Sequence, residues 1–245
     1  MPSEDYMDLD ERDERDDIMD EDNDLVDDVD DNDTDDNDTG DIEDTEDTVT
    51  FASLGLPEEI LAAVTDMGFR VPTPIQAAAI PPLLELRDVV GIAQTGTGKT
   101  AAFGLPLLAI VDADERDVQA LVLAPTRELA MQSAQAIEDF AARTARLDVV
   151  PVYGGSPYGP QIGALKRGAQ VVVGTPGRVI DLIEKGALDL SNVRMLVLDE
   201  ADEMLRMGFA EDVETIASSA PDDRLTALFS ATMPAAIEKV AREHL

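Results

Sequence analysis

The chain has 245 residues and a formal net charge of −35, and its acidic residues are unevenly distributed. Residues 1–50 carry 26 Asp and Glu against 2 Arg, whereas the following 195 residues carry 27 acidic and 16 basic side chains. The absence of cysteine excludes disulfide bonds and thiolate metal sites, and a single histidine, His244, argues against chemistry built on a histidine base or a histidine-rich metal site.

The first 48 residues are predicted to form a disordered acidic tail. They contain few apolar side chains and one aromatic residue, Tyr6, so they cannot bury enough surface to offset the entropy of an ordered chain. Two interpretations of this tail stay open. It is either a solubilising or salt-adapted segment, or an acidic arm that binds basic ribosomal proteins or mimics nucleic acid.

Residues 49–245 are predicted to form one domain that begins with two helices. Residues 56–67 open with Pro57, carry apolar side chains on one face and stop before Gly68, as a capped amphipathic helix does. A second, short helix starts near Pro74 and runs towards Ile80. The sequence shows neither a basic-then-apolar leader nor an apolar run long enough for a membrane span, so we expect a soluble, cytoplasmic protein that makes no contact with membranes.

Beyond these helices, strand and helix patterns alternate. Strands are predicted over residues 88–93, 120–124, 149–153, 170–174, 195–199 and 226–230. Helices are predicted near residues 100–111, 127–142, 160–167, 177–185 and 210–219. Because the strands are apolar throughout, this alternation predicts an α/β fold in which helices cover both faces of a parallel sheet.

A phosphate-binding loop is predicted directly after the first strand. Residues 93–100 read Ala-Gln-Thr-Gly-Thr-Gly-Lys-Thr between an apolar run and a helix-prone stretch, with Ala93 where the strict pattern has glycine. The backbone N–H groups, the ammonium of Lys99 and the hydroxyl of Thr100 suit a triphosphate and its metal ion. A solvated Gly/Thr turn is the alternative.

A second motif, Asp199-Glu200-Ala201-Asp202, follows the apolar run 195–198. Acidic runs also mark the solvated start of a helix, which is the alternative here. A buried strand before the motif would instead place its carboxylates at the carboxyl edge of the sheet, where open α/β sheets bind ligands. Together the two motifs predict an ATP site.

Seven motifs, in this order, resemble those of the DEAD-box RNA helicases. They are Gly68 to Gln76 (GFRVPTPIQ), residues 93–100, Pro125 to Ala130 (PTRELA), Gly154-Gly155, Thr175 to Arg178 (TPGR), residues 199–202 (DEAD) and Ser230-Ala231-Thr232. Residues 51–245 resemble the first RecA-like domain of that family, with its Q motif at 49–77. The sequence of residues 203–209 is similar to that of the bacterial cold-shock and ribosome-assembly branch of the family.

The resemblance implies a P-loop NTPase that binds ATP and Mg²⁺ and couples ATP hydrolysis to RNA remodelling. Lys99, Asp199 and Glu200 are the implied catalytic residues. Thr100 and Asp199 would hold Mg²⁺, and Glu200 would orient and deprotonate the attacking water. The other implied ATP contacts are Phe51, Phe69, Gln76, Ala93, Gln94, Thr95, Gly96, Thr97 and Gly98.

Two further roles follow from the resemblance. Gln76 would select adenine, because a carboxamide can donate to and accept from the base edge at once. Phe51 resembles an aromatic residue that stacks on the base, although a lone Phe is typically a core residue. Asp202, Ser230 and Thr232 resemble the family's element that couples nucleotide state to RNA, the alternative being a polar strand end.

For RNA, the resemblance implies contacts to the sugar–phosphate backbone that do not read base sequence. The implied residues are Pro125, Thr126, Arg127, Gly154, Gly155, Thr175, Pro176, Gly177 and Arg178. Each arginine taken alone is also typical of a surface charge. Ribosomal or RNA-decay proteins are expected as further partners.

The resemblance also implies a second RecA-like domain, which supplies arginines to the γ-phosphate and which residues 1–245 lack. We therefore expect this chain to bind ATP and to hydrolyse it weakly on its own. The alternative is a non-catalytic ATP- and RNA-binding fragment or regulatory module.

Overall fold

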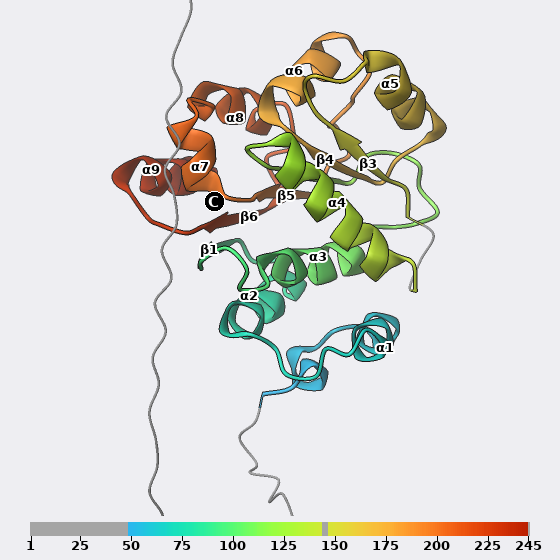
Figure 1. The fold of residues 1–245 in the computed structure, drawn as a ribbon, viewed down its shortest axis with the longest axis vertical. Coiled ribbons are helices and arrows are strands. Elements are labelled where there is room, and N and C mark those ends of the chain that lie inside the picture. The colour runs from blue at the N-terminus through green and yellow to red at the C-terminus, as the bar shows by residue number, and fades with distance from the viewer. Residues whose placement is uncertain (1–48, 144–146, 245) are drawn as a thin grey trace, which may run out of the picture. The chain divides into compact units, whose positions relative to one another are not determined.

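The computed structural model describes residues 49–143 and 147–244 (Figure 1). The predicted disordered tail, residues 1–48, lies outside the described residues. The strands are β1 (Val89–Ile92), β2 (Ala120–Leu123), β3 (Val149–Val152), β4 (Val171–Gly174), β5 (Met195–Leu198) and β6 (Leu225–Ser230). A 3₁₀ turn, η1 (Phe51–Leu54), precedes the α-helices α1 (Glu58–Asp66), α2 (Pro74–Leu84), α3 (Lys99–Ile110), α4 (Arg127–Ala141), α5 (Tyr158–Arg167), α6 (Pro176–Glu184), α7 (Ala201–Arg206), α8 (Ala210–Ala217) and α9 (Ala235–His244).

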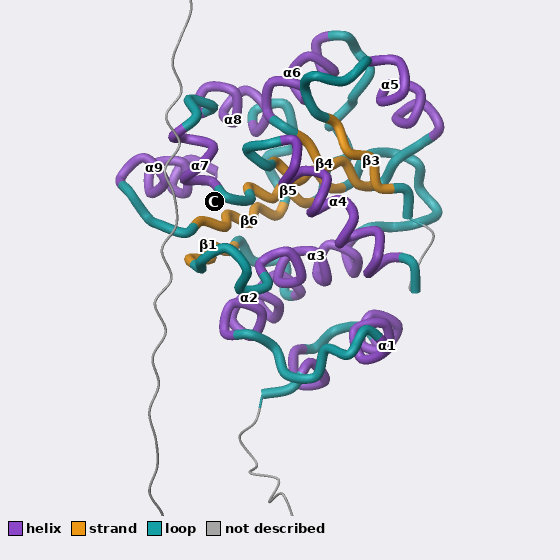
Figure 2. Tube along the Cα trace, in the orientation of Figure 1, coloured by secondary structure: helices purple, strands orange, loops and turns teal. Residues whose placement is uncertain are grey.

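The strands form one six-stranded sheet in the order β1-β6-β5-β2-β4-β3, and every neighbouring pair is parallel. Figure 2 shows the strands as a central layer with helices on both sides. The predicted α/β fold is therefore confirmed, and each predicted strand is found within one residue of its predicted start. Such a sheet needs cover on both faces, because its strands are apolar on both sides.

Each face of the sheet contributes to a separate hydrophobic core. Val122 of β2 packs in the core shared with η1 and helices α1 to α4, whereas its neighbours Leu121 and Leu123 pack in the core shared with helices α5 to α9. This division follows from the two-residue period of a strand. Helix α3 is buried along most of its length, as expected of a helix that is apolar all round. Its packing therefore holds the C-terminal end of the preceding loop in place.

Three helical features differ from the sequence prediction. Helix α2 continues past Ile80 to Leu84, because tertiary packing of its buried residues outweighs two internal prolines, Pro81 and Pro82. Helix α7 is only six residues long and begins inside the acidic motif, so no helical period is visible there. Helix α9, at 235–244, was not predicted. Among the described residues, no helix combines the length and apolar character that crossing a membrane requires.

Gly174 is required at the end of β4 by close packing. A Cβ atom there would lie 2.6 Å from a methyl group of Val152 and 2.6 Å from one of Val179. We expect Gly174→Ala to lower the free energy of unfolding by about 1–3 kcal/mol, the usual cost of overpacking, measured by urea denaturation. Gly159→Ala is the control, since a Cβ on Gly159 would meet nothing within 4 Å. Equal midpoints for the two variants would contradict this packing argument.

Candidate functional site

Three of the predicted motifs follow the three neighbouring strands β1, β6 and β5. Residues 93–100 follow β1, residues 230–232 begin at the last residue of β6, and residues 199–202 follow β5. Because the strands are parallel, their carboxyl ends lie on one edge of the sheet. The structure therefore brings these motifs together on one half of that edge.

The predicted phosphate-binding loop has the backbone conformation that its glycines allow. Gly96 and Gly98 have φ angles of 84° and 89°, in the left-handed region that favours glycine. Gly98 directly precedes α3, so the loop leads into the N-terminus of a buried helix. Free N–H groups and the helix dipole make such a terminus attractive to phosphate.

Gln76 connects this loop to α2. Its Oε1 atom accepts a hydrogen bond from the Thr73 N–H at 2.9 Å, and its Nε2 atom donates to the Gly98 carbonyl at 3.1 Å. A Cβ atom on Gly98 would lie only 2.4 Å from Nε2, so glycine is needed there for space as well as for φ. Both ends of the carboxamide thus have partners within the chain, and adenine selection by Gln76 stays a prediction.

Lys99 and Glu200 form a buried ion pair. The Lys99 ammonium lies 2.7 Å from the Glu200 carboxylate and also donates to the Ala93 carbonyl at 3.0 Å. The Thr95 hydroxyl donates to the same carboxylate oxygen at 3.0 Å. Glu200 has a φ of 52°, a costly conformation for a residue with a side chain. These two of the three predicted catalytic side chains therefore neutralise each other's charge.

Asp199 is buried beside this pair and is incompletely hydrogen-bonded. Its Oδ1 atom has no hydrogen-bond partner, and its Oδ2 atom accepts a hydrogen bond from the Ser133 hydroxyl at 3.5 Å. Burial and the neighbouring Glu200 charge raise the pKa of Asp199 to about 6, although Lys99 opposes the shift. An unpartnered buried carboxylate oxygen beside a helix that starts with Lys99-Thr100 suits a hard cation such as Mg²⁺, which prefers oxygen ligands.

The three predicted coupling residues are in contact. The Thr232 hydroxyl donates to Asp202 Oδ2 at 2.7 Å, and the Asp202 N–H donates to the Ser230 hydroxyl at 3.2 Å. Burial alone would raise the pKa of Asp202, but hydrogen bonds from these two side chains and from backbone N–H groups lower it overall. Hydrogen bonds therefore connect the acidic motif to the end of β6. The coupling of nucleotide state to RNA by these residues stays a prediction.

Two predicted aromatic contacts lie in different environments. The Phe51 ring is 2% exposed and packs edge-on against Phe69 in the core. The Phe69 ring is 37% exposed and also lies edge-on to Phe140. Phe51 thus has the position of a core residue, and its stacking on a base stays a prediction.

The motifs predicted to contact RNA follow the other three strands, β2, β4 and β3, on the same edge of the sheet. Pro125 and Thr126 lead into α4, and Thr126 accepts a hydrogen bond from the Leu129 N–H at the start of that helix. Thr175, Pro176 and Gly177 form the start of α6. Gly154 and Gly155 follow β3, where Gly155 has a φ of 72°. This half of the edge thus combines two helix N-termini with a glycine turn.

The two predicted RNA-binding arginines differ in exposure. Arg127 is exposed, and its guanidinium lies 4.7 Å from the centre of the Tyr153 ring. Arg178 is only 7% exposed and donates to the Gln161 side chain and to the Ser156 carbonyl. Arg178 therefore holds the segment after the glycine turn in place, which sequence reasoning could not foresee from an arginine in a loop motif.

Sequence reasoning also missed two residues at this edge. Ser133, which contacts Asp199, interrupts the otherwise apolar stripe of Ala130, Ala134 and Ile137 on α4, and that interruption is a signal that could have found it. Tyr153, which supports Arg127, gives no comparable signal, because an aromatic residue at a strand end is common.

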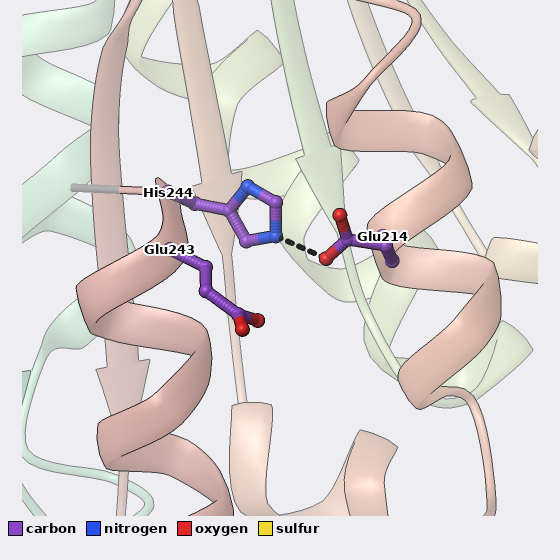
Figure 3. A group of neighbouring side chains, drawn as sticks. All are labelled: Glu214, Glu243 and His244. Carbon is purple, nitrogen blue, oxygen red and sulfur yellow. Dashed lines mark hydrogen bonds and ion pairs between the residues drawn. The ribbon is translucent and has the colours of Figure 1, made fainter.

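One cluster of metal-ligand types lies elsewhere among the described residues, between α8 and α9. Figure 3 shows the His244 ring facing Glu214, with Nε2 and a carboxylate oxygen 2.7 Å apart, and Glu243 beside them. Glu243 also forms an ion pair with Lys239 at 3.6 Å. Each member has a partner in the chain, so these contacts are explained as a link between two helices.

Comparison with known proteins gives consistent matches. Residues 73–240 match the sequence profile of the DEAD/DEAH box helicase family. The chain is 57% identical over 197 residues to the ATP-dependent RNA helicase DeaD of Haemophilus influenzae and 57% identical over 196 residues to that of Escherichia coli. Each match covers 80% of this chain, which spans only about a third of each relative, 32% and 31% of their respective lengths.

A solved structure has the same fold. The crystal structure of a DEAD box protein from the hyperthermophile Methanococcus jannaschii superposes with a TM-score of 0.77 at 45% sequence identity. The match covers 80% of this chain and 53% of that one.

The raised pKa of Asp199 predicts a stability penalty at neutral pH. With a folded pKa of about 6 against an unfolded value of about 3.9, the folded state holds a proton that the unfolded state loses between these values, so stability falls as pH rises from about 4 to 6. We expect Asp199→Asn, without metal or nucleotide, to be more stable than wild type by about 2–3 kcal/mol at pH 8. The difference should vanish below about pH 4.

Urea denaturation at several pH values in EDTA measures this difference. Asp117→Asn, at an exposed position, controls for the loss of one negative charge. A difference that does not change with pH would show that the Asp199 carboxylate is not the source.

Proposed function

This chain belongs to the DEAD/DEAH box helicase family, and we propose that it binds ATP and RNA and couples ATP hydrolysis to RNA remodelling. The observation that carries the proposal is the division of one sheet edge. Its β1-β6-β5 half holds a phosphate-binding loop with buried carboxylates, and its β2-β4-β3 half holds helix N-termini and a glycine turn. Because the two sites share one sheet edge, a conformational change at one site can alter the geometry of the other.

The phosphates of ATP would bind at the loop 93–100 and the start of α3. The backbone N–H groups there suit the oxygens, and Lys99 would meet the β- and γ-phosphates. In contacting these phosphates, Lys99 would give up its ion pair with Glu200. Binding of ATP therefore frees the carboxylate that the reaction requires.

Thr100 and Asp199 would hold Mg²⁺, in agreement with the unpartnered Oδ1 atom of Asp199. When bound, the ion supplies positive charge that stabilises the transferring phosphoryl group. Glu200, once released by Lys99, would accept a proton from the attacking water, and Thr95 would keep that carboxylate oriented. Asp202, Ser230 and Thr232 would relay the nucleotide state to the RNA half of the edge.

RNA would lie along the β2-β4-β3 half of the edge. The N-termini of α4 and α6 and the turn at Gly154-Gly155 offer N–H groups to phosphates without reading bases. Arg127 would add a direct phosphate contact, because it is exposed and its side chain is supported by Tyr153. Binding should therefore depend little on RNA sequence.

The whole protein's organisation is part of this proposal. Residues 49–245 form an ATP-binding RecA-like domain, and a second RecA-like domain supplies the missing arginines in the complete enzyme. The complete enzyme works in the cytoplasm, where ribosomal or RNA-decay proteins are its further partners.

Removal of the Lys99 ammonium tests the nucleotide site. Loss of a charge-assisted hydrogen bond to phosphate costs about 1.5–3 kcal/mol, so we expect Lys99→Ala to weaken Mg²⁺-ATP binding roughly 10- to 100-fold. Isothermal titration of purified protein measures the affinity. Lys239→Ala, at an exposed position of α9, is the matched control. Wild-type affinity in Lys99→Ala would contradict the proposed site.

The salt dependence of RNA binding separates the two arginines. A contact to one phosphate of single-stranded RNA contributes about 0.7 to the slope of log K against log salt, so Arg127→Ala should lower the slope by about that amount. Arg143→Ala, just beyond the other end of α4, should leave the slope unchanged.

Arg178→Ala should lower the free energy of unfolding, because it removes the two hydrogen bonds that Arg178 donates to the Gln161 side chain and the Ser156 carbonyl.

Fluorescence anisotropy with oligouridylate at several salt concentrations measures these slopes. An unchanged slope in Arg127→Ala would refute the phosphate contact. That result would not contradict the proposed nucleotide site, which the Lys99→Ala variant tests separately.

A further inference from the structure

Helix α4 presents one buried polar side chain to the interior. Its other buried residues are apolar: Ala130, Ala134, Ile137, Phe140 and Ala141. Ser133 lies on the same face and is only 4% exposed. A hydroxyl buried in such a stripe costs free energy unless it has a hydrogen-bond partner, so this serine calls for an explanation.

The partner of Ser133 is Asp199, 66 residues later in the chain. The serine hydroxyl lies 3.5 Å from Oδ2, and this is the one side-chain hydrogen bond to Asp199 within residues 49–143 and 147–244. At 3.5 Å the contact is long for an O–H···O hydrogen bond. Ser133 is thus the side chain placed to fix the orientation of the Asp199 carboxylate.

The same helix begins on the other half of the sheet edge. Arg127 is the first residue of α4, and Ser133 follows six residues later, roughly 9 Å along the helix axis. The helix is uninterrupted between them and packs against α3, which carries Lys99 and Thr100. A displacement of the first turn of α4 would therefore also displace Ser133.

We propose that Ser133 is a positioning residue for Asp199, through which α4 links an RNA contact at its first turn to the metal-binding carboxylate. The inference rests on the proposed function, since it assumes that Asp199 binds the metal and that the start of α4 contacts RNA. This link is separate from the contact of Asp202 with Ser230 and Thr232, which connects α7 with the end of β6.

Threonine and valine at position 133 form a matched pair, because they have nearly the same volume and differ in the hydroxyl. Loss of a side chain that orients a metal ligand costs about 10- to 100-fold in metal affinity. With Mn²⁺ as the probe and a non-hydrolysable ATP analogue present, we expect Ser133→Val to weaken Mn²⁺ binding at least tenfold. Ser133→Thr should stay within about threefold of wild type.

Electron paramagnetic resonance of free Mn²⁺ measures the affinity without relying on hydrolysis. Thermal unfolding of both variants checks that they are equally folded at the temperature used. Equal Mn²⁺ affinities in folded Thr and Val variants would overturn the inference. Failure of the wild type to bind Mn²⁺ with the analogue would instead overturn the proposed function.

A second arm tests the link to RNA. Saturating oligouridylate should tighten Mn²⁺ binding by about fivefold or more in wild type and Ser133→Thr, a coupling of ordinary size between two sites. In Ser133→Val this ratio should approach one. The same ratio in both variants, or a ratio of one in the wild type, would overturn the link.

Discussion

The parallel direction of all six strands is the constraint on which the rest of the molecule depends. It places every strand's carboxyl end on one edge, so six loops that are distant in sequence become neighbours there. The strand order then sorts these loops. The end of β5, which carries the acidic motif, lies next to the end of β2, which leads into α4. The proposed nucleotide half and the proposed RNA half of the edge therefore meet between β5 and β2, where Ser133 contacts Asp199.

Electrostatics at this edge concern a few buried charges rather than the strong overall acidity of the chain. Most of the 53 acidic residues in the sequence lie outside the site, whereas Lys99, Asp199 and Glu200 are buried together. Two carboxylates and one ammonium leave an excess negative charge in a region of low dielectric constant. Burial, and after it the neighbouring Glu200 charge, raises the pKa of Asp199, and a bound cation would offset the excess negative charge. This excess negative charge supports the proposal that Asp199 helps to hold a metal ion.

Sequence reasoning predicted the elements well because they depend on local pattern, and the site less completely because side chains depend on packing. Apolar runs and glycine punctuation gave the strands, the loop at 93–100 and the acidic motif. No local pattern shows that the Arg178 side chain points inward and donates to Gln161. Nor does any pattern show that both ends of the Gln76 carboxamide form hydrogen bonds within the chain. Helix α7 was missed because its stability comes from contacts of Asp202 and Met204 rather than from a helical period.

The site also retains features that a purely structural sheet edge would not. Glu200 has a left-handed backbone conformation, and Asp199 keeps an unpartnered oxygen in the interior. Each costs of the order of 1–3 kcal/mol and persists only where the surroundings enforce it. Here the surroundings are fully buried strands on both sides, β2 and β6, whose packing fixes β5 and the residues that follow it. The apolar centre of the sheet therefore stabilises the strained, charged groups at its edge.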